Sequence, residues 1–464
     1  MKPEKRDLAF INATILDGTA DMQPHSDSIV IVRDGTIAHI AEAPVGSDAY
    51  AHAKRLAPGA RIINLAGAYL MPGLINLHAH FIGSGTPVSS GNASALIKLA
   101  QSNPLGRALI HKLIKSAVVT QLASGVTTVR GAGDPALGDI WCRDQIRAGR
   151  FAGPRVVAPG TGITVPGGHG AGLFAEVCET PEDAVRAVRA LAQAGADVIK
   201  LFITGGVFDA EKVGEPGVLR MPPAMIEAAC AASHEAGLPV MAHVESTDGV
   251  LAALEGGVDT IEHGAPMTPQ IEELFQSGSG KQLAGRAPTL TCTISPALPF
   301  VKLPAEKTHS SDVQKVNGDI VCAGIVEGAR RALELGITVG LGTDSSCPYV
   351  THYDMWREVA YFAKYAEVSP AFALHTATAI NAQILGLGDV CGRIAEGLSA
   401  DILVTRENPL EDLAHLRQPL YVMAQGHLIE NPQVKHMSEL DAELDEILAD
   451  NTPLPKTKDL PHAA

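Results

Sequence analysis

Short apolar runs alternate with Ala-rich helical segments through the middle of the chain, from about residue 66 to residue 345. The helical segments, such as 181–192 and 225–236, are followed by a glycine, as helices commonly are. The apolar runs have the length and composition of buried strands. There are eight of them, at residues 71–80, 125–129, 155–158, 197–203, 238–243, 260–263, 289–293 and 338–344. Eight alternating strand and helix units predict an α/β fold, a (β/α)8 TIM barrel.

The two ends of the chain have β patterning instead, interrupted by turn formers such as Asp34-Gly35. We expect them to meet in one small β-sandwich domain beside the barrel. An acidic helix is expected from Ser438, where Asp441 completes a capping-box pattern, and it would dock on this subunit or on a neighbouring one. The predicted domains are 1–66 and 390–434 for the small domain, 67–389 for the barrel, and 435–464 for the acidic helix and tail.

Composition narrows the class of protein. The 464 residues are 46% hydrophobic, which is enough for a large core, and carry a net charge of −15, which disfavours nucleic acid as a partner. The charged start and the lack of a run of about 20 apolar residues predict a cytoplasmic protein without a membrane partner. Seven cysteines without a Cys-x-x-Cys pair predict reduced thiols rather than a disulfide framework. A homo-oligomer is left open.

The first predicted barrel strand closes on His78 and His80. Side chains two apart in a strand share a face, so both imidazoles can bind one metal ion. The alternative is a pair of surface or capping histidines. The two interpretations can be separated by asking whether other predicted strands also end in potential metal ligands. They carry further candidate ligands, namely Lys200, His243, His263 and Asp344. In a closed barrel these strand ends converge, so the residues together predict a metal site at the mouth.

Several motifs resemble those of the amidohydrolase superfamily, and more closely its imidazolonepropionase-like and prolidase-like branch. They are Pro72-Gly-Leu-Ile-Asn-Leu-His-Ala-His80, Val165-Pro-Gly-Gly-His-Gly170, Val198-Ile-Lys-Leu201, Thr204-Gly-Gly-Val207, Ala242-His243, Ile261-Glu-His-Gly264, Gly342-Thr-Asp-Ser345 and Ala395-Glu-Gly-Leu-Ser-Ala-Asp-Ile-Leu-Val404. The resemblance runs from about residue 7 to residue 430. It implies a metal-dependent hydrolase.

The resemblance also implies a ligand set for two divalent metal ions, with zinc favoured. One ion would be held by His78, His80 and Asp344, and the other by His243 and His263. Lys200 would lie between them as a carboxylated lysine. Its apolar setting supports this, because a buried ammonium tends to lose its proton. An unmodified Lys200 beside a single metal ion is the alternative.

Two metal ions that share a hydroxide can attack a carbonyl at neutral pH. Asp344 is suited to take the proton and pass it to the leaving nitrogen, a role that the resemblance also gives it. We therefore expect cleavage of an amide bond in a small molecule such as a dipeptide or an N-acyl amino acid. The alternatives are a mononuclear, imidazolonepropionase-like hydrolase of a cyclic amide, and a barrel that has lost catalysis and serves as a binding module. The complete ligand set argues against the last.

Outside the ligand set, His169 lies in a glycine-rich loop that allows close approach to a ligand, and in related proteins this histidine contacts substrate or the oxyanion. Ordering of the loop is its alternative role. His352 and Arg220 are weaker candidates for substrate contact, and His234 and His375 are expected to be structural. The chain departs from the familiar pattern at 207–212 and 345–347, which leaves the substrate open.

Overall fold

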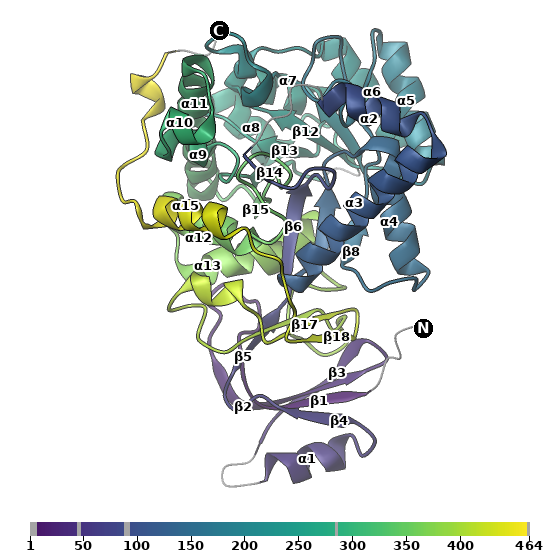
Figure 1. The fold of residues 1–464 in the computed structure, drawn as a ribbon, viewed down its shortest axis with the longest axis vertical. Helices are drawn as coiled ribbons and strands as arrows, with labels where there is room; N and C mark the ends of the chain where they lie inside the picture. The colour runs from purple at the N-terminus through teal and green to yellow at the C-terminus, as the bar shows by residue number, and fades with distance from the viewer. Residues whose placement is uncertain (1–6, 44–47, 88–92, 284–285, 462–464) are drawn as a thin grey trace.

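The computed structural model describes residues 7–43, 48–87, 93–283 and 286–461. Figure 1 shows a large part of mixed helices and strands above a smaller part dominated by one sheet. Within the described residues, no helix is both long enough and apolar enough to cross a bilayer.

The large part contains all eight predicted barrel strands, and every strand pair in it is parallel. Three strands form one sheet, namely β6 (Leu74–Ala79), β7 (Val126–Gly131) and β8 (Arg155–Val157). Five more belong to a second sheet, namely β11 (Ile199–Phe202), β12 (Val240–Val244), β13 (Thr260–His263), β14 (Thr289–Cys292) and β15 (Val339–Leu341). The second sheet also contains two short strands that the pattern does not predict, β9 (Gly162–Thr164) and β10 (Ala175–Val177).

Backbone hydrogen bonds join the edges of these two sheets. At one junction, the amide of Asp344 donates to the carbonyl of His78 at 2.8 Å, and the amide of His80 donates to the carbonyl of Ser345 at 3.1 Å. At the other, the amide of Asp197 donates to the carbonyl of Ala158 at 2.8 Å. The segment after β15 therefore lies against the end of β6, which brings residues far apart in sequence together.

Helices follow most of these strands and cover their outer side (Figure 1). The two helices that the sequence predicts most directly are α5 (Pro181–Gln193), which begins with a capping box of Thr180 and Asp183, and α6 (Pro223–Glu235). The others in this part are α2 (Ala93–Gln101), α3 (Pro104–Ala123), α4 (Gly138–Arg147), α7 (Thr247–Gly256), α8 (Pro269–Ser277), α9 (Leu298–Lys302), α10 (Ala305–Thr308), α11 (Asp312–Glu334), α12 (Met355–Tyr365), α13 (Pro370–His375) and α14 (Asn381–Ile384).

The small part is an eight-stranded sheet that both ends of the chain build. Its strands are β1 (Leu8–Ile15), β2 (His25–Arg33), β3 (Thr36–Glu42), β4 (Arg61–Asn64), β5 (Tyr69–Pro72), β16 (Ile402–Thr405), β17 (Tyr421–Ala424) and β18 (His427–Glu430). Alternating residues of β1 face opposite ways, and helix α1 (Ala49–Leu56), which the pattern does not predict, packs on the face that Ala9 and Ile11 share. All eight strands belong to one hydrogen-bonded sheet, whereas the sequence pattern predicts a β-sandwich, which has two sheets.

The structure corrects the first predicted strand, 71–80. Residues up to Pro72 belong to β5, where Met71 lies opposite Leu403 of β16, and only the part from Leu74 belongs to β6. Gly73 separates the two, and a Cβ atom there would lie 2.2 Å from a side-chain carbon of Thr127. Glycine is therefore the residue that lets the chain pass directly from one sheet into the other.

The C-terminal helix α15 (Ser438–Ala449) docks on its own chain, beside α12 (Figure 1). The predicted capping box is wrong, because Met437 occupies the N-cap position and no side chain caps the helix. Instead, Arg357 of α12 holds the helix: its guanidinium lies 2.7 Å from the carboxylate of Asp445 and is itself almost fully buried. Leu440, Leu444 and Ile447 form the buried side of α15.

Candidate metal centre

His78, His80 and Asp344 meet where β6 and β15 end. Nε2 of His78 lies 3.4 Å from Oδ1 of Asp344, and Nε2 of His80 lies 3.6 Å from the same atom. Oδ1 is buried and has no hydrogen-bond partner among the described residues. Asp344 has a φ of 57°, a left-handed conformation that costs energy in a residue with a side chain. The local backbone therefore directs three potential ligand atoms towards one point.

His243 and His263 lie beside this group, at the ends of β12 and β13. Their ring centroids are 4.6 Å apart, and the centroids of His263 and His78 are 4.9 Å apart, so the imidazoles form a continuous cluster. Nδ1 of His263 lies 2.7 Å from the hydroxyl of Thr293. Its Nε2 is buried without a partner in the part of the chain that the structure describes. This atom is therefore available to a bound ion.

Lys200 projects from β11 into the same space. Its side chain is completely buried, and Nζ has no hydrogen-bond partner among the residues described. Nζ lies 4.9 Å from the ring centroid of Phe202. Burial lowers the pKa of Lys200 to about 8, although the charges of Glu262 and Asp344 oppose this change. A buried amine with no partner is a group that a further ligand or a modification would satisfy.

Burial also keeps the clustered imidazoles neutral. It lowers the pKa of His80 to about 3, and it lowers the pKa values of His78, His243 and His263 well below the ordinary value, with a further contribution from the charge on Lys200. Burial has the opposite effect on a carboxyl group, and it raises the pKa of Asp344. Neutral imidazoles present a lone pair, which is what a metal ion requires.

Glu262 and Arg130 are buried partners of this cluster that the sequence analysis did not identify. Oε2 of Glu262 lies 2.7 Å from Nδ1 of His78, and Nη2 of Arg130 donates to Oε1 of Glu262 at 2.7 Å. Arg130 also donates to the carbonyl of Leu77 at 2.7 Å. An imidazole that ligates a metal usually bonds a carboxylate or carbonyl through its other nitrogen, and Glu262 provides that contact.

His80 is fixed in a comparable way by a backbone carbonyl. Its Nδ1 lies 2.6 Å from the oxygen of Gly133. The carboxylate of the next residue, Asp134, accepts a hydrogen bond from the amide of Phe81 at 2.9 Å. The segment that follows β6 is therefore bonded to the segment that follows β7 at two successive residues, His80 and Phe81. Asp134 is fully buried, and burial together with the charge of Asp139 raises the pKa of Asp134 well above its ordinary value.

Glu245 is a third residue that the sequence analysis missed. It follows β12, two residues after His243, and each of His243, Glu245 and His263 has a potential ligand atom within 4.8 Å of those of the other two. The corresponding group on the other side consists of His78, His80 and Asp344. The signal was present in the sequence, because His243-x-Glu245 has the same spacing as His78-x-His80.

His169 lies against the second histidine pair. Its ring stacks on that of His243 with centroids 4.6 Å apart, and Phe174 and Phe202 flank it. A Cβ atom on Gly206 would lie 2.5 Å from Nδ1 of His169, so the glycine makes room for the ring. The loop that the sequence singles out thus places its histidine beside the candidate centre.

The other histidine and arginine residues that the sequence analysis considered each contact a neighbouring group in the structure. Nε2 of His352 lies 2.7 Å from the carbonyl of Gly83, in the segment that follows β6. Nη2 of Arg220 pairs with Glu215 at 2.5 Å, whereas its buried Nε has no hydrogen-bond partner among the described residues. The two histidines expected to be structural each have a local partner: His234 lies 2.8 Å from Asp259, and His375 lies 2.7 Å from the carbonyl of Gly18.

The fold and the site together define an α/β protein with a candidate site for metal ions at the ends of its parallel strands. The chain belongs to the amidohydrolase family, whose model matches residues 69–429.

Three relatives illustrate the similarity. A candidate prolidase from Bifidobacterium longum is 35% identical, with a TM-score of 0.83, and the match covers 96% of this chain and 100% of that structure. A Xaa-Pro dipeptidase with methionine bound in its active site is 26% identical, with a TM-score of 0.75 over 91% of this chain and 100% of that structure. Imidazolonepropionase of Salinispora tropica is 25% identical over 418 residues, which is 83% of this chain and 88% of that protein. These similarities agree with a hydrolase that acts on C–N bonds and with the TIM-barrel fold of the family.

Proposed function

We propose that this protein is a metal-dependent hydrolase that cleaves an amide bond of a dipeptide or an N-acyl amino acid. The observation that carries the proposal is the convergence of His78, His80, His243, His263, Lys200 and Asp344 in one buried cluster. A buried group of this composition is costly unless something binds to it. The similarity to a candidate prolidase and to a Xaa-Pro dipeptidase supports the choice of a dipeptide or a related amide as substrate.

The proposal includes closure of the parallel strands into one barrel. Strands β6, β7, β8, β11, β12, β13, β14 and β15 would form the (β/α)8 barrel, with the two edge junctions described above as its closing contacts. The sheet built from both chain ends would be the small domain, with boundaries near residues 66, 390 and 434. In a closed barrel the site occupies the C-terminal mouth, where the enzymes of this fold carry out their chemistry.

The residues present fit two divalent metal ions. His78, His80 and Asp344 would hold one ion, and His243 and His263 would hold the other. Lys200, carboxylated on its neutral Nζ by carbon dioxide with loss of a proton, would add carboxylate oxygens to this ligand set. Three observations support this fit: Oδ1 of Asp344, Nε2 of His263 and Nζ of Lys200 are all buried, and each lacks a hydrogen-bond partner within the described residues. Imidazole and carboxylate ligands suit zinc and also manganese, iron and cobalt, and zinc is the ion we favour.

Metal ions in such a site supply an activated water and polarise the scissile carbonyl. The protein's own groups would do the rest. Asp344, next to the imidazoles, would accept the proton of the attacking water and deliver it to the leaving nitrogen. His169, held against His243, would donate a hydrogen bond to the oxygen that becomes negatively charged. Glu262 would keep Nε2 of His78 directed at the site.

A mononuclear hydrolase of a cyclic amide is the second candidate. It is favoured by the similarity to imidazolonepropionase over most of both chains. In that case Lys200 would remain an unmodified amine, and one metal ion per chain would support full activity. The metal content of the active enzyme separates the two candidates.

The test is a substrate panel with the metal-replete chain. Dipeptides, N-acyl amino acids and imidazolone propionate are assayed after loading with zinc or manganese, and Asp344→Asn serves as the inactive control. Turnover of a linear amide by the wild type alone supports the proposal. Turnover of the cyclic amide alone supports the second candidate, and no turnover of any substrate by fully loaded protein would overturn both.

A further inference from the structure

Two groups of potential metal ligands lie side by side in the cluster, and both have the same composition. Each group offers two imidazoles and one carboxylate, and within each group the ligand atoms lie no more than 4.8 Å apart. A catalytic zinc ion in hydrolases is commonly held by this combination. Within the part of the chain that the structure describes, the two groups are His78, His80 and Asp344, and His243, Glu245 and His263.

Glu245 reaches its position because of where it stands relative to β12. It follows His243 by two residues, and side chains two apart in an extended segment project to the same side. Its backbone amide donates to Oγ1 of Thr204 at 3.1 Å, and Thr204 is a fully buried residue just after β11. The backbone of Glu245 is thereby tied to the strand that carries Lys200.

The two histidines of this group each have one ring nitrogen already bonded. Nε2 of His243 donates to the carbonyl of Gly205 at 2.6 Å, and a carbonyl only accepts, so Nδ1 keeps its lone pair. Nδ1 of His263 lies 2.7 Å from the hydroxyl of Thr293, and its Nε2 is buried with no hydrogen-bond partner among the residues described. Each imidazole therefore has one nitrogen left for an ion.

A carboxylate at this place changes the ligand count of the second ion. With His243 and His263 alone, that ion has two neutral protein donors, whereas a catalytic zinc ion usually has three protein ligands. Lys200 gains a carboxylate only by reaction with carbon dioxide, but Glu245 carries one as part of the sequence. A negative donor also offsets part of the charge of a divalent ion among buried groups.

We propose that Glu245 is a ligand of the second metal ion, together with His243 and His263. This inference rests on the proposed function, which assigns two ions to the cluster, and it goes beyond it by adding a carboxylate ligand to one of them. Donor atoms that are about 2.1 Å from one ion lie at most about 4.2 Å apart. The three ligand atoms, which lie within 4.8 Å of one another, need to close only slightly around an ion.

The competing role for Glu245 is to bind the ammonium group at the free amino end of a dipeptide, as a charge-assisted hydrogen bond would allow. The geometry favours the metal ion. The carboxylate of Glu245 lies beside two imidazoles that burial keeps neutral, and this arrangement repeats the one that Asp344 has with His78 and His80.

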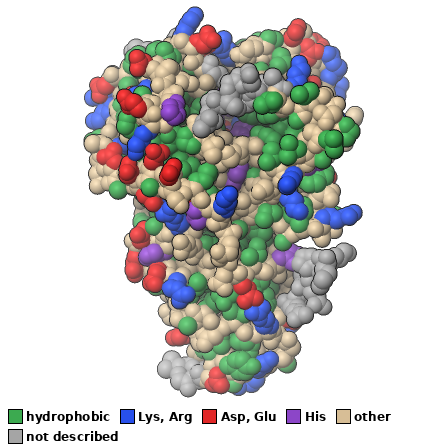
Figure 2. Space-filling model, viewed as in Figure 1, with side chains coloured by type: hydrophobic (Ala, Val, Ile, Leu, Met, Phe, Trp, Pro, Cys, Tyr) green, Lys and Arg blue, Asp and Glu red, His purple; other side chains and the backbone are tan. Residues whose placement is uncertain are grey.

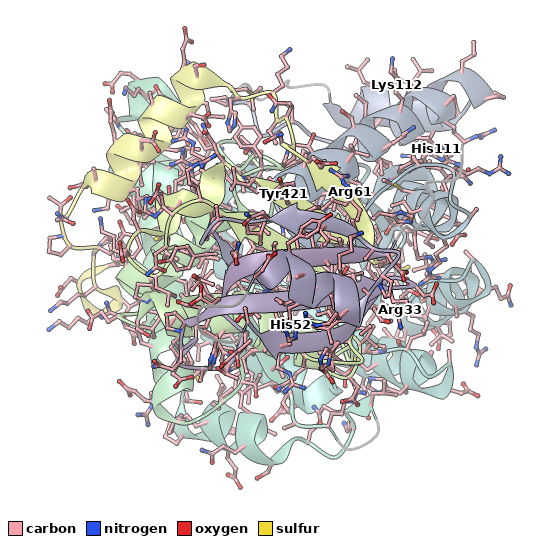
Figure 3. The ribbon with its side chains drawn as sticks, turned by 90° about the horizontal axis from the view of Figure 1, so that it is seen from below. Arg33, His52, Arg61, His111, Lys112 and Tyr421 are labelled. Atoms are coloured by element: carbon pink, nitrogen blue, oxygen red, sulfur yellow. The ribbon has the colours of Figure 1, made fainter. Side chains whose placement is uncertain are left out.

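Other acidic and histidine residues lie away from this group. Figure 2 shows Asp and Glu side chains gathered on the side of the molecule where Figure 1 places α15. In Figure 3, His52 of α1 and His111 of α3 lie well apart from each other. Because the acidic surface at α15 can hold ions loosely, gel filtration has to precede any count of bound metal.

The zinc content and zinc affinity of the full chain test the proposal. After gel filtration, the wild type is expected to hold two ions, and Glu245→Gln is expected to hold one. In a zinc titration, the affinity for the second ion should fall by more than about 100-fold, beyond the 10- to 100-fold effect usual for a residue that only orients a ligand. The matched control is Glu439→Gln, which removes an exposed carboxylate of α15 and should keep both ions. Circular dichroism checks that each variant is folded.

Three results would overturn the proposal. The first is a folded Glu245→Gln variant whose affinity for the second ion falls by less than about 10-fold. The second is a fall of about 10- to 100-fold, which would make Glu245 a positioning residue. The third is a variant that keeps both ions but has a raised KM for a dipeptide and an unchanged KM for its N-acetyl derivative, which would assign Glu245 to the substrate ammonium group.

These failures are distinct from a failure of the proposed function. A wild type that holds two ions and hydrolyses a linear amide upholds the proposed function, whatever Glu245→Gln does. A wild type that holds a single ion at full activity would overturn both the two-ion centre and the role of Glu245 in it.

Discussion

Oε2 of Glu262 lies 2.7 Å from Nδ1 of His78, on the side of the imidazole that faces away from Asp344. An ionised carboxylate only accepts hydrogen bonds, so Nδ1 carries the proton and Nε2 keeps its lone pair. The positive charge of Arg130, 2.7 Å from the other oxygen, supports the ionised state of Glu262 against the effect of burial, which raises its pKa. The pair thus fixes both the orientation and the tautomer of one candidate ligand.

Glu262→Gln is expected to weaken metal binding or activity by about 10- to 100-fold, because an amide in this position no longer fixes the tautomer of His78. Thr291→Val is the control, since Thr291 accepts only a longer hydrogen bond of 3.2 Å from Arg130 and does not contact His78 through any hydrogen bond described. Metal content and the rate with saturating metal should be measured together. An unchanged metal affinity and rate in Glu262→Gln would contradict the assigned role.

Asp344→Asn is expected to lower kcat by about 10²- to 10⁴-fold, the usual contribution of a positioned acid or base. Asparagine tolerates the left-handed backbone of this position, so the melting temperature should stay close to that of the wild type. Asp344→Ala should lose activity and also stability, because alanine does not favour a φ of 57°. Full turnover by Asp344→Asn would rule out the proposed proton transfer.

Gly206→Ala should reduce kcat/KM without removing metal. The new methyl group would lie 2.5 Å from Nδ1 of His169 and push the ring out of its stack with His243. The backbone of Gly206 is extended, so alanine itself fits there. Gly59→Ala, which meets no other atom within 4 Å, is the control for a glycine replacement. If Gly206→Ala keeps wild-type kinetics, His169 has no part in the reaction.

Removal of metal by a chelator should abolish activity, and zinc or manganese should restore it. Because bound metal stabilises the folded state by mass action, the metal-free chain should also be less stable, by about 2.7 kcal/mol relative to protein at a free metal concentration of 100 times Kd. The number of ions per chain at full activity decides between the two candidate functions. Two ions fit the proposed centre, and a single ion fits the cyclic-amide alternative.

Arg357→Met should lower the free energy of unfolding by about 3–5 kcal/mol, the usual cost of removing one partner from a buried ion pair. It would leave the buried carboxylate of Asp354 without its cation, 3.0 Å away, and free α15 from its contact with α12. Arg330→Met is the control, because its pair with Glu367 is largely exposed and should contribute less than about 1 kcal/mol. Urea denaturation of both variants measures the difference, and equal effects would show that α15 is held by other contacts.

The sequence predicted the strands well because each carries a short apolar run, and it predicted the cluster because its ligands stand at strand ends. The three residues near the cluster that the sequence analysis did not identify were missed for different reasons. Arg130 and Glu262 lie within strands, where a charged residue gives no sign of what it faces until the neighbouring strands are placed. Glu245 was within reach, since its spacing from His243 repeats that of the opening histidines.

Predictions from local sequence patterns were also wrong at positions where tertiary contacts set the secondary structure. The pattern of 71–80 predicts a single strand, yet pairing of Met71 with Leu403, more than 300 residues later, assigns its first part to another sheet. Ser438 satisfies a capping pattern, but the contacts of Arg357 with Asp445 set where α15 lies, and the helix begins without a side-chain cap. The short strands β9 and β10 are too brief for any periodicity to reveal them.

The passage through Gly73 has a practical consequence for chimeric proteins. Because a single residue links β5 to the N-terminal end of the strand that bears His78 and His80, the position of the small sheet sets where that strand begins, at the end opposite the two imidazoles. Exchanging that sheet with one from a relative would therefore have to transplant residues 69–73 together with 402–405 as a unit. A graft cut between them would shift the register of the imidazoles even though no residue near them had been replaced.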